Sequence, residues 1–96
     1  MIEIRQTEVF AAWLRTMRDR QARARIQVRI DRLQLNLAGD IRSVGKGVSE
    51  LRIDYGPGYR VYFTRPAREC IVLLVGGDKR TQDRDIKKAV QLARAL

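Results

Sequence analysis

Residues 55–63 read YGPGYRVYF, a tight turn followed directly by a strand, and this stretch decides the fold. Glycine and proline at 56–58 tolerate or fix unusual φ values, so they predict the turn. Because successive side chains of a strand point to opposite faces, the strand from residue 59 has one apolar and one mixed face. The two faces carry Tyr59, Val61 and Phe63 on one side, and Arg60, Tyr62 and Thr64 on the other. An ordinary core strand has no need of a guanidinium, so Arg60 is the first candidate functional residue.

The residues before the turn predict a second strand that pairs with the first. Leu51 and Ile53 alternate with Arg52 and Asp54, which is the period of a strand with one buried face. Pairing across the turn then predicts a core face under helices and an open polar face. The expected open face carries Glu50, Arg52, Arg60, Tyr62 and Thr64. Since antiparallel sheets often leave one face in water, a solvated surface in which Arg52 pairs with Glu50 or Asp54 is the simplest interpretation.

Further basic candidates lie on either side of these strands. The run CIVLLV at 70–75 is apolar on both faces, which predicts a central strand ended by the two glycines that follow it. Its thiol, Cys70, is expected to be a buried structural group rather than a nucleophile. Beyond the glycines, Lys79 and Arg80 are expected at one end of the sheet, and Lys46 precedes the first strand of the pair.

Helical periodicity is found toward both ends of the chain, after a short opening strand at 2–5. The first helix is capped by Thr7, the second runs from a break near Asp19 to Gly39, and the third begins near Thr81. Their apolar stripes are Phe10, Trp13, Leu14 and Met17; Ala22, Ile26, Ile30, Leu33 and Leu37; and Ile86, Ala89, Val90 and Ala93. The order β-α-α-β-β-β-α predicts a single α+β domain over residues 1–96, an antiparallel sheet with a helical hairpin on one face. Trp13 and Tyr59 are expected in its core.

The chain is strongly basic, with 20 Lys and Arg against 11 Asp and Glu and a net charge of +9. Such a field attracts polyanions: nucleic acid first, then an acidic protein or an anionic membrane. Arginine predominates, and its planar fork suits phosphate groups. Candidate contacts to ribosomal RNA or to an acidic partner on the second helix are Arg23, Arg25, Arg29 and Arg32.

The composition also excludes several classes of site. The chain has no histidine, which excludes the imidazole pair of many ribonucleases. With one cysteine besides, it has too few ligands for most zinc sites, so we expect neither metal nor cofactor. The start MIEIRQTEVF lacks the pattern of a signal peptide, and no apolar run is long enough to span a bilayer. We therefore expect a cytoplasmic protein with no membrane partner.

Arginines and tyrosines on one sheet face suit the cleavage of RNA. Arginine binds phosphate in bidentate fashion, and tyrosine rings stack on unpaired bases. When a ribose 2′-hydroxyl attacks the neighbouring phosphorus, fixed guanidinium groups stabilise the charge that develops on the phosphoryl oxygens. A guanidinium cannot act as a base, so proton transfer would fall to Lys46, Lys79, Glu50 or a tyrosine.

Two segments, GVSELRIDYGPGYRVYF at 47–63 and IVLLVGGDKRTQDRDIKKA at 71–89, resemble the RelE/ParE toxin superfamily of bacterial toxin–antitoxin systems. They are most similar to its short branch of addiction module killer proteins, near the HigB toxins. The resemblance covers nearly the whole chain and has the same element order. It implies a ribosome-dependent mRNA endonuclease. It also implies an adjacently encoded antitoxin, often a helix-turn-helix DNA-binding protein.

The resemblance also assigns roles to residues. It implies catalytic functions for Arg60, for Arg80 with Lys79 beside it, and for Arg52. The sequence departs from the RelE pattern at Ile86, which stands in place of a catalytic tyrosine, and at Glu50, in place of a strand lysine. As substitutes we expect Tyr62 or Tyr55 to stack on an mRNA base, and Lys46 or Lys79 to transfer protons.

Two other functions remain open at this point. A ParE-like toxin shares this fold but poisons DNA gyrase, and the departures just described lend that alternative some weight. A catalytically inactive binding module is the other, in which the arginines of the second helix dock an acidic antitoxin or ribosomal RNA. A ribonuclease toxin would stop translation first, whereas a gyrase poison would cause DNA damage.

Overall fold

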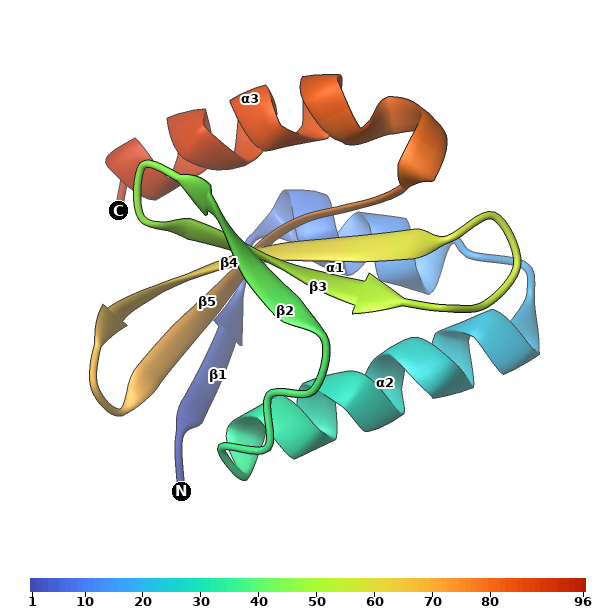
Figure 1. The fold of residues 1–96 in the computed structure, drawn as a ribbon, viewed down its shortest axis with the longest axis horizontal. Coiled ribbons are helices and arrows are strands. Elements are labelled where there is room, and N and C mark those ends of the chain that lie inside the picture. Colours follow the sequence, from blue (N-terminus) through green and yellow to red (C-terminus); the bar gives the residue numbers. More distant parts are fainter.

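The computed structural model describes all residues, 1–96, as a five-stranded sheet with helices on both of its faces (Figure 1). In chain order the elements are β1 (Glu3–Gln6), α1 (Glu8–Arg15), α2 (Arg20–Gln34), β2 (Ile41–Gly45), β3 (Val48–Ile53), β4 (Tyr59–Ala67), β5 (Cys70–Asp78), the 3₁₀ turn η1 (Lys79–Thr81) and α3 (Gln82–Arg94). The predicted α+β class is confirmed, with one strand, β2, added to the predicted order. None of the helices has the length and apolar character needed to cross a membrane.

The sheet has the strand order β1-β5-β4-β3-β2. Strands β2 to β5 form an antiparallel meander, while β1 lies parallel to β5 with Ile4 opposite Ile71. The sheet is therefore mixed and not purely antiparallel as predicted, because β1 runs parallel to β5 at one edge. The strand β2 was missed because Ile41 and Val44 do not alternate, and the register shifts between Ser43 and Gly45.

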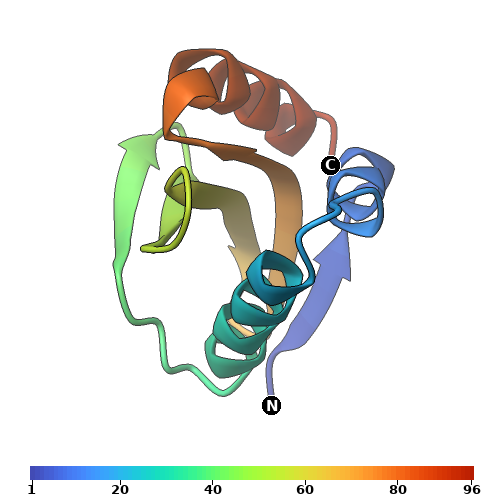
Figure 2. The same cartoon turned by 90° about the vertical axis from the view of Figure 1, so that its right-hand side faces the viewer.

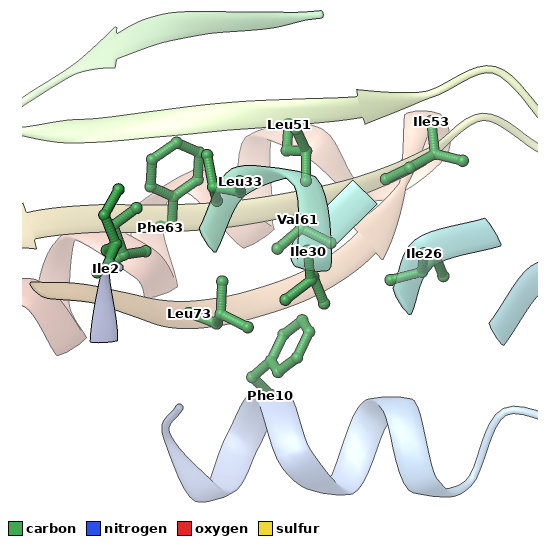
Figure 3. Packing of buried hydrophobic residues seen from close by; sticks show 11 residues of the cluster. Ile2, Phe10, Ile26, Ile30, Leu33, Leu51, Ile53, Val61, Phe63 and Leu73 are labelled. Atoms are coloured by element: carbon green, nitrogen blue, oxygen red, sulfur yellow. The ribbon is translucent and has the colours of Figure 1, made fainter. Parts of the chain in front are cut away.

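One face of the sheet packs on α1 and α2 as predicted. Figure 3 shows Phe10 of α1 projecting between Leu73 of β5 and Ile30 of α2. The buried cluster contains Ile2, Phe10, Ile26, Ile30, Leu33, Leu51, Ile53, Val61, Phe63, Ile71 and Leu73. Trp13 and Tyr59 pack against it, which confirms that their rings belong to the core.

The opposite face of the sheet is covered by α3, so the prediction of an open polar face is wrong (Figure 2). The predicted apolar stripe of α3 needs a surface to bury it, and the helical hairpin already occupies the other face. The second cluster joins β3, β4, β5 and α3 and consists of Val48, Tyr62, Val72, Leu74, Val75 and Ala89. Tyr62 is completely buried there. Cys70, expected to be buried, is only half-buried at its border.

The ends of the helices follow the predicted signals except at one point. The side chains of Thr7 and Asp19 accept hydrogen bonds from the backbone N–H groups of Phe10 and Ala22, and so cap α1 and α2. Helix α2 ends at Gln34 rather than at the predicted Gly39. Asn36 adopts φ 65° and begins the left-handed turn that ends the helix. Leu37, expected in the apolar stripe, is consequently exposed.

Gly76 and Gly77 lie inside β5 and do not end it, contrary to the sequence prediction. Successive strand residues face opposite sides of the sheet. A Cβ on Gly76 would overlap the ring of Trp13, and a Cβ on Gly77 would overlap the carboxylate of Asp85. Both helical layers therefore approach the backbone of β5 closely, and only glycine leaves room for them.

Candidate functional site

A hollow of about 380 Å³ opens where β3 and β4 meet the end of β5. It brings together three of the residues that the sequence singled out, Arg52, Arg60 and Lys79. They come from β3, β4 and η1, so the fold collects them from separate segments. The remaining lining residues are Asp40, Ile53, Asp54, Gly56, Pro57 and Gly58. We call this hollow the Arg60 hollow.

Arg60 lies on the α3 face of β4, and its side chain is only 12% exposed. Its Nε is buried without a hydrogen-bond partner and lies 3.8 Å from Oε1 of Glu50, which is an ion-pair contact. Its Nη1 donates to the carbonyl oxygens of Gly58, at 3.0 Å, and Tyr59, at 3.2 Å. The third nitrogen, Nη2, is not buried and forms no hydrogen bond within the chain. Arg60 thus faces a buried carboxylate on one edge and keeps another edge free.

Arg52 pairs with Asp40, not with Glu50 or Asp54 as the simplest interpretation supposed. Its Nη2 and Nε lie 2.8 Å and 3.1 Å from the same carboxylate oxygen, Oδ1 of Asp40. This hydrogen-bonded pair lowers the pKa of Asp40 and raises that of Arg52. Asp40 was missed because it precedes β2, the strand without a clear alternating pattern. The pair forms one wall of the Arg60 hollow.

Lys79 and Arg80 begin the 3₁₀ turn that Asp78 caps. Arg80 bends back to Asp78, with 3.1 Å between Nη2 and Oδ2, and this hydrogen bond is the main reason why the pKa of Asp78 is lowered. Arg80 lines a second, shallow hollow of about 410 Å³ beside α3 and not the Arg60 hollow. Lys79 lines both. Of this predicted basic pair, Lys79 is therefore the one that accompanies Arg60.

Two predicted stacking residues do not reach the hollow. Tyr62 is buried under α3, where burial above all raises its pKa, so it presents no ring to a ligand and is no base at neutral pH. This corrects the expectation that it stacks on a base. Tyr55 turns toward α2 instead, where its hydroxyl lies 3.1 Å from Oε1 of Gln21 and its ring lies under Arg25, with 4.5 Å to the centroid.

Lys46 lies far from the other candidates. It occupies the β2–β3 turn with φ 57°. Along β3, Val48 pairs with Thr64 while Arg52 pairs with Arg60. The turn that carries Lys46 is therefore at the opposite end of the strand from the Arg60 hollow.

Comparison with known proteins gives the chain a family. The family described as "Phage derived protein Gp49-like (DUF891)" matches residues 12–96. The chain belongs to this family. Gp49-like proteins are a RelE/HigB-like toxin family. The chain is therefore a toxin-like member of toxin–antitoxin systems, for which a cognate antitoxin is the implied partner.

A protein of Haemophilus influenzae (strain Rd) is 50% identical to this Gp49-like chain over 95 residues. The alignment covers 99% of the chain and 96% of the relative, which bears the name "Uncharacterized protein". No solved structure matches the chain at a significant level.

The four predicted arginines of α2 in the Gp49-like chain fall into two groups. Arg29 is committed to the fold, because it donates to the carbonyl oxygens of Arg52, Ala38 and Asp40, at 2.6 Å, 3.4 Å and 3.4 Å. The other three are exposed: Arg25 over Tyr55, Arg23 in a groove of about 570 Å³ between α1 and α2, and Arg32 in another hollow of about 430 Å³.

Replacing Arg29 by alanine should lower the free energy of unfolding by about 2 kcal/mol, since three backbone carbonyls lose a charged donor. The matched change, Arg32→Ala, removes an exposed arginine of the same helix and should stay within about 0.5 kcal/mol of wild type. Urea denaturation of the two purified variants checks the difference. Equal losses would contradict the division of the α2 arginines.

Proposed function

We propose that this Gp49-like protein is the toxin of a type II toxin–antitoxin system and a ribosome-dependent mRNA endonuclease of the addiction module killer branch. One observation carries the proposal. Arg52, Arg60 and Lys79 line one hollow although they come from three separate segments. Cations converging on one open site are the arrangement that a phosphodiester requires.

The chemistry is attack of a ribose 2′-oxygen on the adjacent phosphorus, with loss of the 5′-oxygen of the next nucleotide. Negative charge grows on the phosphoryl oxygens in the transition state. The hydrogen bonds of Nη1 and the ion pair with Glu50 hold the guanidinium of Arg60, so its free Nη2 can meet that charge without reorganising. Arg52 and Lys79 supply the remaining positive field of the hollow.

Proton transfer falls to residues that line the same hollow. Of the candidates named from sequence, Glu50 and Tyr62 are buried and Lys46 lies at the other end of β3. Lys79 remains, and as an ammonium it suits donation to the leaving 5′-oxygen. Asp54 also lines the hollow and forms no ion pair, whereas Asp40 is engaged by Arg52. We assign the acceptor role to Asp54.

The partners follow from charge. A net charge of +9 favours the RNA of the ribosome and of the message, and binding of this kind weakens steeply with salt. Of the four predicted arginines of α2, the exposed Arg23, Arg25 and Arg32 remain available for such contacts. The antitoxin is proposed to be an adjacently encoded helix-turn-helix DNA-binding protein that neutralises the toxin.

The test is inducible expression in bacteria, with mapping of 5′ ends on a reporter mRNA that carries or lacks a start codon. Wild type should produce new 5′ ends on the translated reporter alone, and Arg60→Ala should produce none while still binding its antitoxin. Cleavage of both reporters would remove the ribosome from the proposal. Growth arrest with DNA damage and without cleavage would favour a gyrase poison. Undiminished cleavage by a stable Arg60→Ala protein would refute the assignment.

A further inference from the structure

Glu50 is a carboxylate with no exposed surface, on the sheet face that α3 covers. It contacts three other elements. Arg42 of β2 donates from Nε to Oε1 at 3.3 Å, and Gln82 of α3 donates from Nε2 to Oε2 at 3.1 Å. The Nε of Arg60, on β4, lies 3.8 Å from Oε1. A single carboxylate thus joins the edge strand, the central strand and the last helix.

The packing between α3 and the sheet does not require a charged side chain. The second cluster, which lies on the same face, consists of apolar and aromatic side chains, among them Val48, Tyr62 and Leu74. Burying an ionised carboxylate costs several kcal/mol before its partners compensate, and apolar residues of similar volume often replace buried ion pairs without loss. What the carboxylate adds is orientation, because it fixes the groups that point at it.

The orientation of Arg60 is the first consequence. The side chain reaches diagonally across the β3–β4 pair, since Glu50 lies opposite Tyr62 and Arg60 is two residues away. Glu50 attracts Nε into the interior, while the carbonyl of Gly58 receives Nη1. The guanidinium is held on these two sides, its Nη2 has no partner within the chain, and Arg60 lines the hollow.

The position of Lys79 is the second consequence. Gln82 is the first residue of α3 and directly follows the turn that carries Lys79. Its hydrogen bond to Glu50 ties the start of this helix to β3. The carboxylate that holds Arg60 therefore also sets how far the Lys79 turn stands from the sheet.

We propose that Glu50 is a positioning residue whose buried carboxylate aligns Arg60 and the Lys79 turn for the reaction. This inference rests on the proposed endonuclease function. It also explains how the site accommodates an acidic residue where the RelE pattern has a basic one. Glu50 is buried and does not line the hollow that contains Arg52, Arg60 and Lys79.

The test compares wild type, Glu50→Gln and Arg42→Gln in ribosome-programmed cleavage with purified toxin. Glu50→Gln keeps the shape of the side chain and removes its charge. We expect kcat to fall about 10- to 100-fold, as for a reacting group displaced by about 1 Å, with KM within about twofold of wild type. Arg42→Gln removes the partner of the same carboxylate that lies outside the hollow, and it should cleave at nearly the wild-type rate.

A second readout does not depend on activity. In ¹⁵N–¹H spectra of arginine side chains, the Nε–H of Arg60 should exchange slowly with water in wild type and Arg42→Gln, because it is buried against Glu50. In Glu50→Gln this protection should fall at least tenfold. Rapid exchange in wild type would overturn the inference without any variant.

The outcomes separate the inference from the function on which it rests. A wild type that cuts no RNA refutes the endonuclease proposal, while the exchange of the Arg60 Nε–H still decides whether Glu50 holds the guanidinium. A wild type that cuts, together with a Glu50→Gln protein that cuts equally well, overturns the positioning role alone. Should Glu50→Gln fail to bind antitoxin, Gln82→Leu replaces it, and that variant must lower kcat severalfold for the inference to stand.

Discussion

Replacing Arg60 by lysine should slow mRNA cleavage roughly 100-fold, the loss typical of removing one fixed transition-state donor. The three nitrogens of Arg60 have different surroundings: Nε lies beside Glu50, Nη1 donates to the carbonyls of Gly58 and Tyr59, and Nη2 has no partner within the chain. A lysine keeps the charge but has one nitrogen, which cannot reach all three places. Single-turnover cleavage on programmed ribosomes measures the effect.

The stability of Arg60→Lys should change far less than its activity. Losing the hydrogen bonds to Gly58 and Tyr59 costs about 1–2 kcal/mol, and the charge beside Glu50 is kept. The matched control is Arg42→Lys, the same chemical change on the other side of the same carboxylate, which should cleave normally. If Arg60→Lys cleaved mRNA at the wild-type rate, only the positive charge at this position would matter. The planar geometry of the guanidinium group would then have no role in the reaction.

Replacing Gly77 by alanine should destabilise the protein by about 3 kcal/mol, a large effect for a single methyl group. The new Cβ would overlap the carboxylate of Asp85 and lie 2.9 Å from Oγ1 of Thr81. Asp85 cannot move aside easily, because it is buried and accepts a hydrogen bond from that hydroxyl. The melting temperature should fall by roughly 12–24 °C, which calorimetry would measure.

A matched substitution at Gly47 distinguishes the effect of steric overlap from the effect of backbone strain. Gly47 has φ +77° and open space around it, so Gly47→Ala carries only the conformational cost of about 1 kcal/mol. Gly77 has no such left-handed backbone, so its whole effect is steric. If the two variants lost the same stability, the close approach of α3 to β5 would be wrong.

The alternation of β3 and β4 was enough to predict one layer of the fold and the centre of the site. Leu51, Ile53, Val61 and Phe63 lie in the first core as their parity required. The side chains opposite them include Arg52 and Arg60, which share a hollow. A period-two pattern predicts which side chains are buried together, because successive side chains of a strand lie on opposite faces of the sheet.

The alternation of side chains along a strand does not predict which element covers each face of the sheet. The burial of one face by α3 could therefore not be predicted from the strand sequences. Glu50, Arg60 and Tyr62 look like a wet surface, yet α3 buries two of them completely. The partners of buried Glu50, Gln82 and Arg42, are distant in sequence, and no local pattern predicts them. The pairing of Arg52 with Asp40 was missed for the same reason. Gly77 was read as a strand end because the close approach of Asp85 is a tertiary contact.

The parallel pairing of β1 with β5 has a consequence for the timing of synthesis. The segments β1, α1 and α2 are synthesised before β5, the strand that pairs with β1. Their apolar side chains therefore stay exposed until β5 has been synthesised. Lys79 and Gln82 emerge later still, which leaves the Arg60 hollow without one wall until translation is nearly over. The Arg60 hollow is therefore complete only after the start of α3 has been synthesised, and a nascent chain lacks it.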